Sequence, residues 1–192
     1  MNINNLETNK GHILNKVFLI KPEIHLDERG FFYESWNSKK FNEKFGPVNF
    51  CQDNHSHSSR GVIRGIHYQL NPYSQGKLVR CTRGSIFDIA VDLRRNSPTF
   101  KEWVGIELNE KNKYLLWIPE GFGHGFLTIS RVADVQYKVT KKWDKDSEKI
   151  ILWNDPDLKI DWPLKKIKPL VSEKDSFGLT SKEAEKLNFV FE

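Results

Sequence analysis

The chain has 192 residues, of which 38% are hydrophobic and 12% aromatic, so it can bury the core of one ordinary domain. Its formal charge of +5 is spread along the sequence, which suits an anionic small molecule and differs from the dense Lys/Arg blocks of nucleic-acid-binding arms. Two cysteines make no disulfide framework, and no run of about 18 apolar residues could cross a bilayer. We therefore expect a cytoplasmic protein with no nucleic-acid or membrane partner.

The predicted elements are mostly short strands. A helix is expected at 38–45, before a long polar stretch. Alternating or β-branched segments then predict strands at 77–81, 85–93, 104–108, 115–118, 126–129 and 135–139. Clusters of Gly, Pro and Asn separate these strands as turn signals. Many short strands with few helices indicate a sandwich or a barrel.

The C-terminal part of the chain is less regular. Residues from about 164 to 177 are predicted to form an irregular tail that packs back on the body, and a helix is expected at 180–187. No internal repeat, low-complexity tract or Gly/Ser linker divides the sequence. We therefore predict one domain over residues 1–192.

The densest polar segment, 52–69, is rich in side chains that donate, accept or titrate. If it is a strand, Arg64 and His67 would face opposite sides, because side chains alternate along a strand. We predict that Gly65 marks a β-bulge that re-aims one of them. On this pattern alone, His67 is equally well explained as a core histidine with satisfied hydrogen bonds.

Three histidines raise the alternative of a metal centre. His55-x-His57 would place two imidazoles on one face of a strand, and a Pro-x-Gly-x-x-His fragment ending at His124 could bring a third. Both fragments resemble the two motifs of cupins, whose metal-binding members add a Glu shortly after the His-x-His pair. Residues 59–65 contain no Glu, so this resemblance favours a cupin-like barrel over a metal site.

Other catalytic classes have less support. Nothing in the local sequence places Cys51 or Cys81 beside a base and an oxyanion donor, as nucleophilic catalysis would require. No Gly-rich stretch lies between a strand and a long helix, so phosphate-loop and dinucleotide fingerprints are absent. Chemistry on nucleoside triphosphates or NAD is therefore disfavoured.

A series of motifs resembles the dTDP-4-dehydrorhamnose 3,5-epimerase family over roughly residues 17–175. In chain order they are DERGFFYE (27–34), QDNHS (52–56), RGIHYQ (64–69), QGKLVR (75–80), DIAVDLR (88–94), SPTF (97–100), WIPEGFGHGF (117–126), YK (137–138), WNDP (153–156) and SEKD (172–175). The resemblance implies a mainly β fold, a double-stranded β-helix (an RmlC-like cupin or jelly-roll barrel) with a few short peripheral helices. It also implies a homodimer that uses neither a metal nor an organic cofactor.

The family epimerises C3 and C5 of dTDP-4-dehydro-6-deoxy-D-glucose, which gives dTDP-4-dehydro-6-deoxy-L-mannose for dTDP-L-rhamnose biosynthesis. A proton beside a ketone is only weakly acidic, so the reaction needs a base, a group that stabilises the enolate and an acid on the opposite face. By resemblance, His67 is the base and Asp175 is the partner that orients it. Tyr137 is then the proton donor, and Lys77 is the cation at the C4 oxygen.

The resemblance also implies substrate-binding positions. They are Arg29, Glu34, Gln52, Asn54, Arg64, His124, Trp143, Glu148 and Lys174. Arg29 and Arg64 suit the diphosphate, because a guanidinium can bind two oxygens at once. Trp143 stands where the family commonly has a Tyr stacked on thymine, and its indole keeps the stack but lacks the phenol hydroxyl.

Three alternatives stay open. The protein could invert only C3 or only C5, or act on a related nucleotide-deoxyhexulose. It could be a metal-dependent cupin enzyme with His55, His57 and His124 as ligands. It could also be a sugar-nucleotide-binding module without catalysis.

Overall fold

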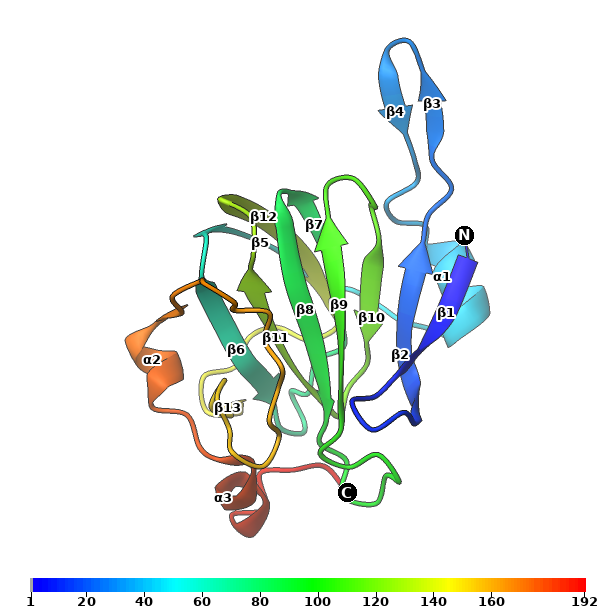
Figure 1. Ribbon diagram of the computed structural model, residues 1–192. Helices are drawn as coiled ribbons and strands as arrows, with labels where there is room; N and C mark the ends of the chain where they lie inside the picture. Colours follow the sequence, from blue (N-terminus) through cyan, green and yellow to red (C-terminus); the bar gives the residue numbers. More distant parts are fainter. Residues whose placement is uncertain (1) are drawn as a thin grey trace.

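Two mostly antiparallel sheets that face each other form the body of the protein (Figure 1). The structure, a computed structural model, describes residues 2–192. The first sheet has the order β1 (Asn2–Glu7), β2 (Ile13–Lys21), β10 (Leu115–Ile118), β7 (Lys77–Arg83), β12 (Val132–Val139) and β5 (Gln52–Ser59). The second sheet has the order β13 (Glu148–Ile150), β6 (Val62–Gln69), β11 (Phe122–Thr128), β8 (Ser85–Asp92) and β9 (Trp103–Asn109), and β14 (Leu170–Val171) pairs in parallel with β6.

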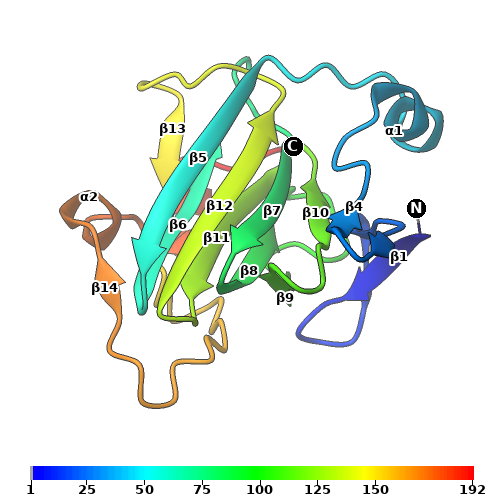
Figure 2. The ribbon, with the colours of Figure 1, turned by 90° about the horizontal axis from the view of Figure 1, so that it is seen from above.

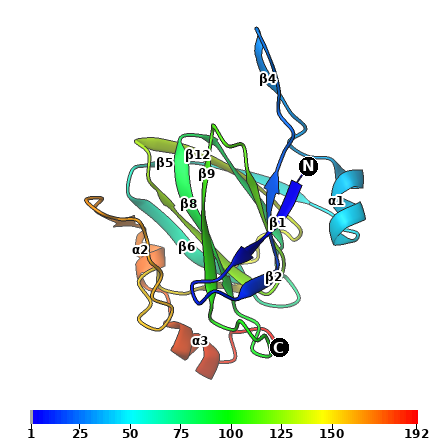
Figure 3. The same ribbon diagram turned by 45° about the vertical axis from the view of Figure 1, so that its right-hand side comes forward.

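The other elements lie around this body. A hairpin of β3 (His25–Asp27) and β4 (Gly30–Phe32) projects away from it in Figure 1 and Figure 3. The helices of the described residues are short, namely α1 (Ser38–Phe45), α2 (Glu173–Ser176) and α3 (Ser181–Lys186). Seen from above, α1 lies on the opposite side of the barrel from α2 and β14 (Figure 2). A mainly β protein with a few short peripheral helices is thus confirmed.

Apolar side chains from both sheets fill the space between them. Val79 and Val135 of the first sheet are buried there, together with Ala90 and Phe126 of the second. Burying a valine or phenylalanine side chain stabilises the fold by roughly 1.5–3 kcal/mol. Because residues of a strand alternate between faces, the next residues along these strands point to the outer faces.

Both outer faces are covered as well. Residues that follow the last long strand, including Leu158, Trp162 and Ala184, bury the outer face of the second sheet. On the first sheet, Phe41 of α1 packs edge-on against Trp117. The predicted helix at 38–45 matches α1, and Asn37 caps it by accepting the Lys40 backbone N–H.

Two expectations need correction. The strand predicted at 126–129 begins earlier, at Phe122. The prediction missed this start because Gly123 and Gly125 are poor strand formers, although they are needed where β11 packs closely on its neighbours. A Cβ atom at Gly123 would lie 2.6 Å from Ile66 Cγ2. The tail predicted to be irregular contains both β14 and α2, which are too short to leave a periodic pattern in the sequence.

Candidate active site

His67 on β6 is paired with a carboxylate that comes from far along the chain. Its Nε2 atom lies 2.6 Å from Asp175 Oδ1, and Asp175 Oδ2 accepts the Gly65 backbone N–H at 3.2 Å. The single turn of α2 presents Asp175, because the Ser172 hydroxyl caps the turn and accepts the Asp175 N–H. Burial opposes ionisation of Asp175, yet these hydrogen bonds and His67 hold its pKa below its ordinary value.

A bulge in β6 aims Arg64 and His67 to the same side. His67 pairs with His124 of β11, whereas Arg64 pairs with Phe126, so two residues of β6 oppose the single residue Gly125. His124 and Phe126 are two apart on one strand and point the same way, and so do their partners across the ladder. The predicted bulge at Gly65 is therefore confirmed.

Lys77 on β7 is buried, with 8% of its surface exposed, and its Nζ donates to the His67 carbonyl oxygen at 3.2 Å. Burial lowers the pKa of Lys77 to about 8, although the negative charges of Glu148 and Asp88 partly oppose this shift by raising the pKa. Tyr137 on β12 pairs with Val79, two residues after Lys77, so the phenol and the ammonium point to the same side of the first sheet. Burial raises the pKa of Tyr137, which keeps its hydroxyl protonated near neutral pH.

Several of the predicted binding residues lie beside these groups. Asn54 on β5 pairs directly with Tyr137 and accepts a hydrogen bond from Gln52 at 2.7 Å. Glu148 on β13 pairs with Gln69, two residues after His67. Its negative charge attracts the Lys77 ammonium and favours the protonated form of that amine.

Glu148 Oε2 also joins two further predicted binding residues. It accepts the indole N–H of Trp143 at 3.1 Å and lies 2.5 Å from Lys174 Nζ. The Trp143 side chain remains 56% exposed, so one face of its ring is free to stack on a planar group.

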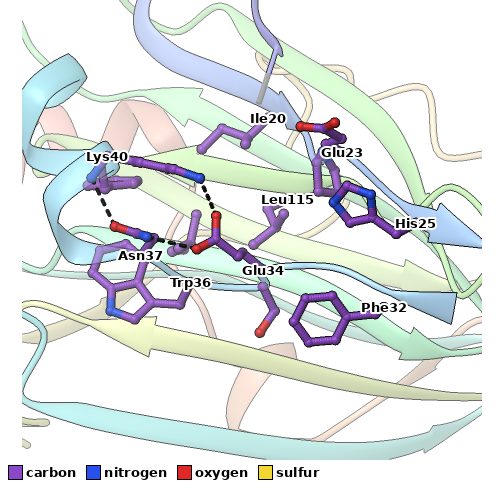
Figure 4. A pocket seen from close by; sticks show the side chains of 13 residues that line it. Ile20, Glu23, His25, Phe32, Glu34, Trp36, Asn37, Lys40 and Leu115 are labelled. Atoms are coloured by element: carbon purple, nitrogen blue, oxygen red, sulfur yellow. Dashed lines mark hydrogen bonds and ion pairs between the residues drawn. The ribbon is translucent and has the colours of Figure 1, made fainter.

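Two predicted binding residues are not brought to His67 within one chain. Arg29 lies on the projecting hairpin, 85% exposed, and among residues 2–192 its ion pair is with Asp27 of the same hairpin. Glu34 lies at the foot of the hairpin in a cavity of about 300 Å³, where it contacts Lys40 and Asn37 (Figure 4). Leu78 and Leu115 line that cavity from the outer face of the first sheet, whereas His67 and Lys77 belong to the inner side.

The histidines of the metal alternative are also separated. His55 and His57 are exposed on β5, where both lie near Asp134, with His57 Nδ1 at 2.5 Å from Asp134 Oδ1. His124 is buried on the other sheet, where its Nε2 lies 2.8 Å from Asp88 Oδ1. Within residues 2–192, no three His, Cys, Asp or Glu side chains are grouped so that they could hold a metal ion. In the same residues, no helix is long and apolar enough to span a membrane.

Asp88 is the buried group that the sequence interpretation left without a role. It lies on β8 with no exposed surface, and its Oδ2 atom has no hydrogen-bond partner among the described residues. An acidic residue in the middle of an otherwise apolar strand, Ile86 to Val91, was the signal available in the sequence.

Comparisons with known proteins agree with this geometry. The family model described as dTDP-4-dehydrorhamnose 3,5-epimerase matches residues 12–183. The chain is 54% identical to the dTDP-4-dehydrorhamnose 3,5-epimerase of Pseudomonas aeruginosa over 88% of this chain and 93% of that protein. It is 40% identical to a dTDP-4-dehydrorhamnose 3-epimerase of Streptomyces niveus, over 88% of this chain and 81% of that protein.

A solved structure extends the likeness to the fold. The RmlC epimerase of Legionella pneumophila, in complex with dTDP-4-keto-L-rhamnose, superimposes with a TM-score of 0.86 at 44% identity, covering 94% of both chains. The architecture is accordingly the cupin-type barrel of RmlC epimerases. By sequence and by fold, this chain belongs to the dTDP-4-dehydrorhamnose 3,5-epimerase family.

Proposed function

We propose that this protein is a dTDP-4-dehydrorhamnose 3,5-epimerase, which converts dTDP-4-dehydro-6-deoxy-D-glucose into dTDP-4-dehydro-6-deoxy-L-mannose. The observation that carries the proposal is the His67–Asp175 pair, next to the buried Lys77 and on the same inner side as Tyr137. The identity of 54% to the 3,5-epimerase of Pseudomonas aeruginosa exceeds the 40% identity to the 3-epimerase of Streptomyces niveus, which favours inversion at both carbons. Both cysteines are free thiols, which suits a cytoplasmic location.

The chemistry follows from these four side chains. His67 takes the proton from C3 or C5, and the electron pair moves into the bond to C4 and onto the C4 oxygen. The Lys77 ammonium stabilises that negative oxygen, and a buried cation does so more effectively than one in water. Tyr137 then returns a proton from the opposite face, which inverts the carbon, and solvent resets the imidazolium and the phenolate. Asp175 orients the imidazole and stabilises its charged form.

The nucleotide part of the substrate would be bound by the groups around Glu148. The exposed ring of Trp143 stacks on the base, and Arg64 and Lys174 meet the diphosphate. Arg64 is already oriented, because its Nε donates to Ser58 Oγ at 3.1 Å.

We further propose a homodimer in which the hairpin completes the partner's site. The hairpin exposes Leu26, Phe31 and Phe32, which a second copy would cover. Arg29 and Glu34 then act on the substrate held by the other subunit.

Mixing two inactive variants tests this arrangement. His67→Ala removes the base, and Arg29→Ala removes the hairpin cation. If Arg29 serves the partner, a mixed dimer has one site with both groups intact, and refolded mixtures regain about a quarter of the wild-type sites. No regained activity would mean that Arg29 acts within its own chain, and full activity of Arg29→Ala on its own would mean that Arg29 has no role.

The reaction itself is tested by proton NMR of the substrate with enzyme in D₂O, with a chelator present. Loss of the signals at both C3 and C5 supports the proposal, whereas loss at one carbon identifies a single-centre epimerase. Activity that disappears with the chelator would indicate the metal-dependent alternative. His67→Ala and Tyr137→Phe should abolish or strongly slow exchange. His57→Ala, which alters an exposed His–Asp pair outside the barrel, is the matched control and should retain it.

A further inference from the structure

A second histidine–carboxylate pair lies beside the first. His124 on β11 stands opposite His67 on β6, so the two imidazoles are cross-strand neighbours. Each ring is held by its own carboxylate, His67 by Asp175 and His124 by Asp88 at 2.8 Å. The side chains of His124 and Asp88 are 7% and 0% exposed. The proposed function uses the first pair and leaves Asp88 without a task.

Charged groups surround Asp88 inside the barrel. His124 faces it from β11, and Lys77 and Cys81 face it from β7. Lys77 in turn is influenced by Glu148 from β13 and hydrogen-bonds the His67 carbonyl of β6. Burial raises the pKa of Asp88 and of the Cys81 thiol, and it lowers the pKa of His124.

A buried charge is expensive unless an opposite charge compensates it. Lys77 and Asp88 therefore fit best as one cation and one anion, with a neutral thiol and a neutral His124 ring beside them. A neutral ring carries only one N–H group. An ionised Asp88 can only accept a hydrogen bond, so that proton belongs on His124 Nε2.

We propose that Asp88 is a positioning residue of the epimerase, which fixes His124 with a bare Nδ1 and serves as the buried counter-ion of Lys77. The bare Nδ1 accepts a hydrogen bond from a hydroxyl group of the sugar, and stabilisation of the C4 oxygen is left to Lys77. This inference rests on the proposed function for its catalytic consequence, but its structural part concerns the ligand-free protein.

The tautomer is measured first in the wild-type protein without substrate. The ¹⁵N NMR signals of the His124 ring should show a protonated Nε2 and a bare Nδ1 at pH 7. The opposite tautomer would overturn the proposal, and this result does not depend on any variant folding or on any activity.

Asp88→Asn tests the consequence. The amide can donate to Nε2, so the His124 proton should move to Nδ1. The variant also removes the counter-charge of Lys77, so its amine should titrate at least about one pH unit lower by ¹³C NMR of its ε-carbon. The alkaline limb of the kcat profile should shift by the same amount, and kcat at pH 7 should fall by about 100-fold or more.

Asp92→Asn is the matched control. Asp92 lies on the same strand, is equally buried and hydrogen-bonds Arg94 and Thr99. This variant should lower Tm while the His124 tautomer and the alkaline limb stay unchanged. If Asp88→Asn behaves like Asp92→Asn, Asp88 is merely structural and the proposal is wrong. If the wild type exchanges no protons on the proposed substrate, the proposed function fails, while the two NMR titrations still decide the role of Asp88.

Discussion

Gly65 is the residue on which the alignment of the catalytic side chains depends, and its replacement by alanine is a sharp test. Its φ angle is +111°, and an added Cβ would lie 2.5 Å from the His124 carbonyl oxygen and 2.8 Å from Gly125 Cα. Both neighbours are backbone atoms of β11, so a side chain cannot simply turn away. The Gly65 N–H also holds Asp175.

The expected cost has two parts. A non-glycine residue at a positive φ angle costs about 1–2 kcal/mol, and overpacking against the backbone costs about 1–3 kcal/mol. Together they predict that Gly65→Ala lowers the free energy of unfolding by about 2–5 kcal/mol. For a chain of this size that corresponds to a fall in Tm on the order of 10 °C. A displacement of His67 near 1 Å would slow proton exchange roughly 100-fold.

Gly11→Ala provides the control. Gly11 also has a positive φ angle, +82°, but nothing lies within 4 Å of an added Cβ. It should lose only the conformational part, about 1–2 kcal/mol, and keep its activity. Urea unfolding and the D₂O exchange assay measure both effects. Equal losses of stability and activity in the two variants would refute the argument that β6 and β11 must approach closely at Gly65.

Three further predictions follow from the site. Asp175→Asn should lower kcat by about 10²–10⁴-fold in the exchange assay, because an amide stabilises the wrong tautomer of His67. Since the folded state holds the pKa of Asp175 below its ordinary value, the stability it contributes is present above about pH 4 and is lost as the pH falls through the folded value. Thermal melts at acidic pH should therefore show a shallower acid limb for this variant than for the wild type. Lys77 gives a dependence of the same sign at higher pH: its folded pKa of about 8 lies below the ordinary 10.5, so the unfolded chain binds more protons in that interval and stability rises with pH. The stability difference between wild type and Lys77→Met should change by about 3 kcal/mol between pH 7 and 11 in favour of the wild type, and no change would contradict the burial of a charged amine. Trp143→Ala should raise the Kd for dTDP by about 10-fold through loss of stacking, with kcat nearly unchanged, as titration calorimetry and kinetics can show.

Local patterns were enough to predict the strands of the middle of the chain and a mainly β class, whereas the double-stranded β-helix was implied by the family resemblance and β1 to β4 were not predicted. The strands around Val79, Ala90 and Val135 alternate or are β-branched, and these properties directly reflect burial on one or both faces. The bulge was predictable because Gly65 interrupts a strand that carries two polar groups at odd spacing. Single-turn α2 was not predictable, since four residues leave no period and its position depends on the hydrogen bond that Asp175 accepts from the distant His67.

The site was predictable only where the family resemblance supplied the roles. No spacing rule links His67 to a carboxylate 108 residues away, because the barrel closes that distance through long-range pairing. Asp88 was missed because its role depends on residues that are its neighbours only in the folded protein. These are His124 on the neighbouring strand and Lys77 on the facing sheet.

The two histidine pairs differ in exposure, and this difference fits their tasks. His67 keeps 29% of its side chain exposed, so the proton that it removes can exchange with water before a second carbon reacts. His124 is sealed at 7%, where a change of charge would be costly and a fixed tautomer is easily maintained. A base that must reset after each inversion needs contact with solvent, whereas a hydrogen-bond acceptor that only orients the sugar does not. In D₂O, deuterium should therefore enter the substrate carbons through Tyr137 and the proton taken by His67 should pass to the solvent, while the proton on His124 Nε2 persists across many turnovers. Fast solvent exchange at His124 would argue against this division of roles.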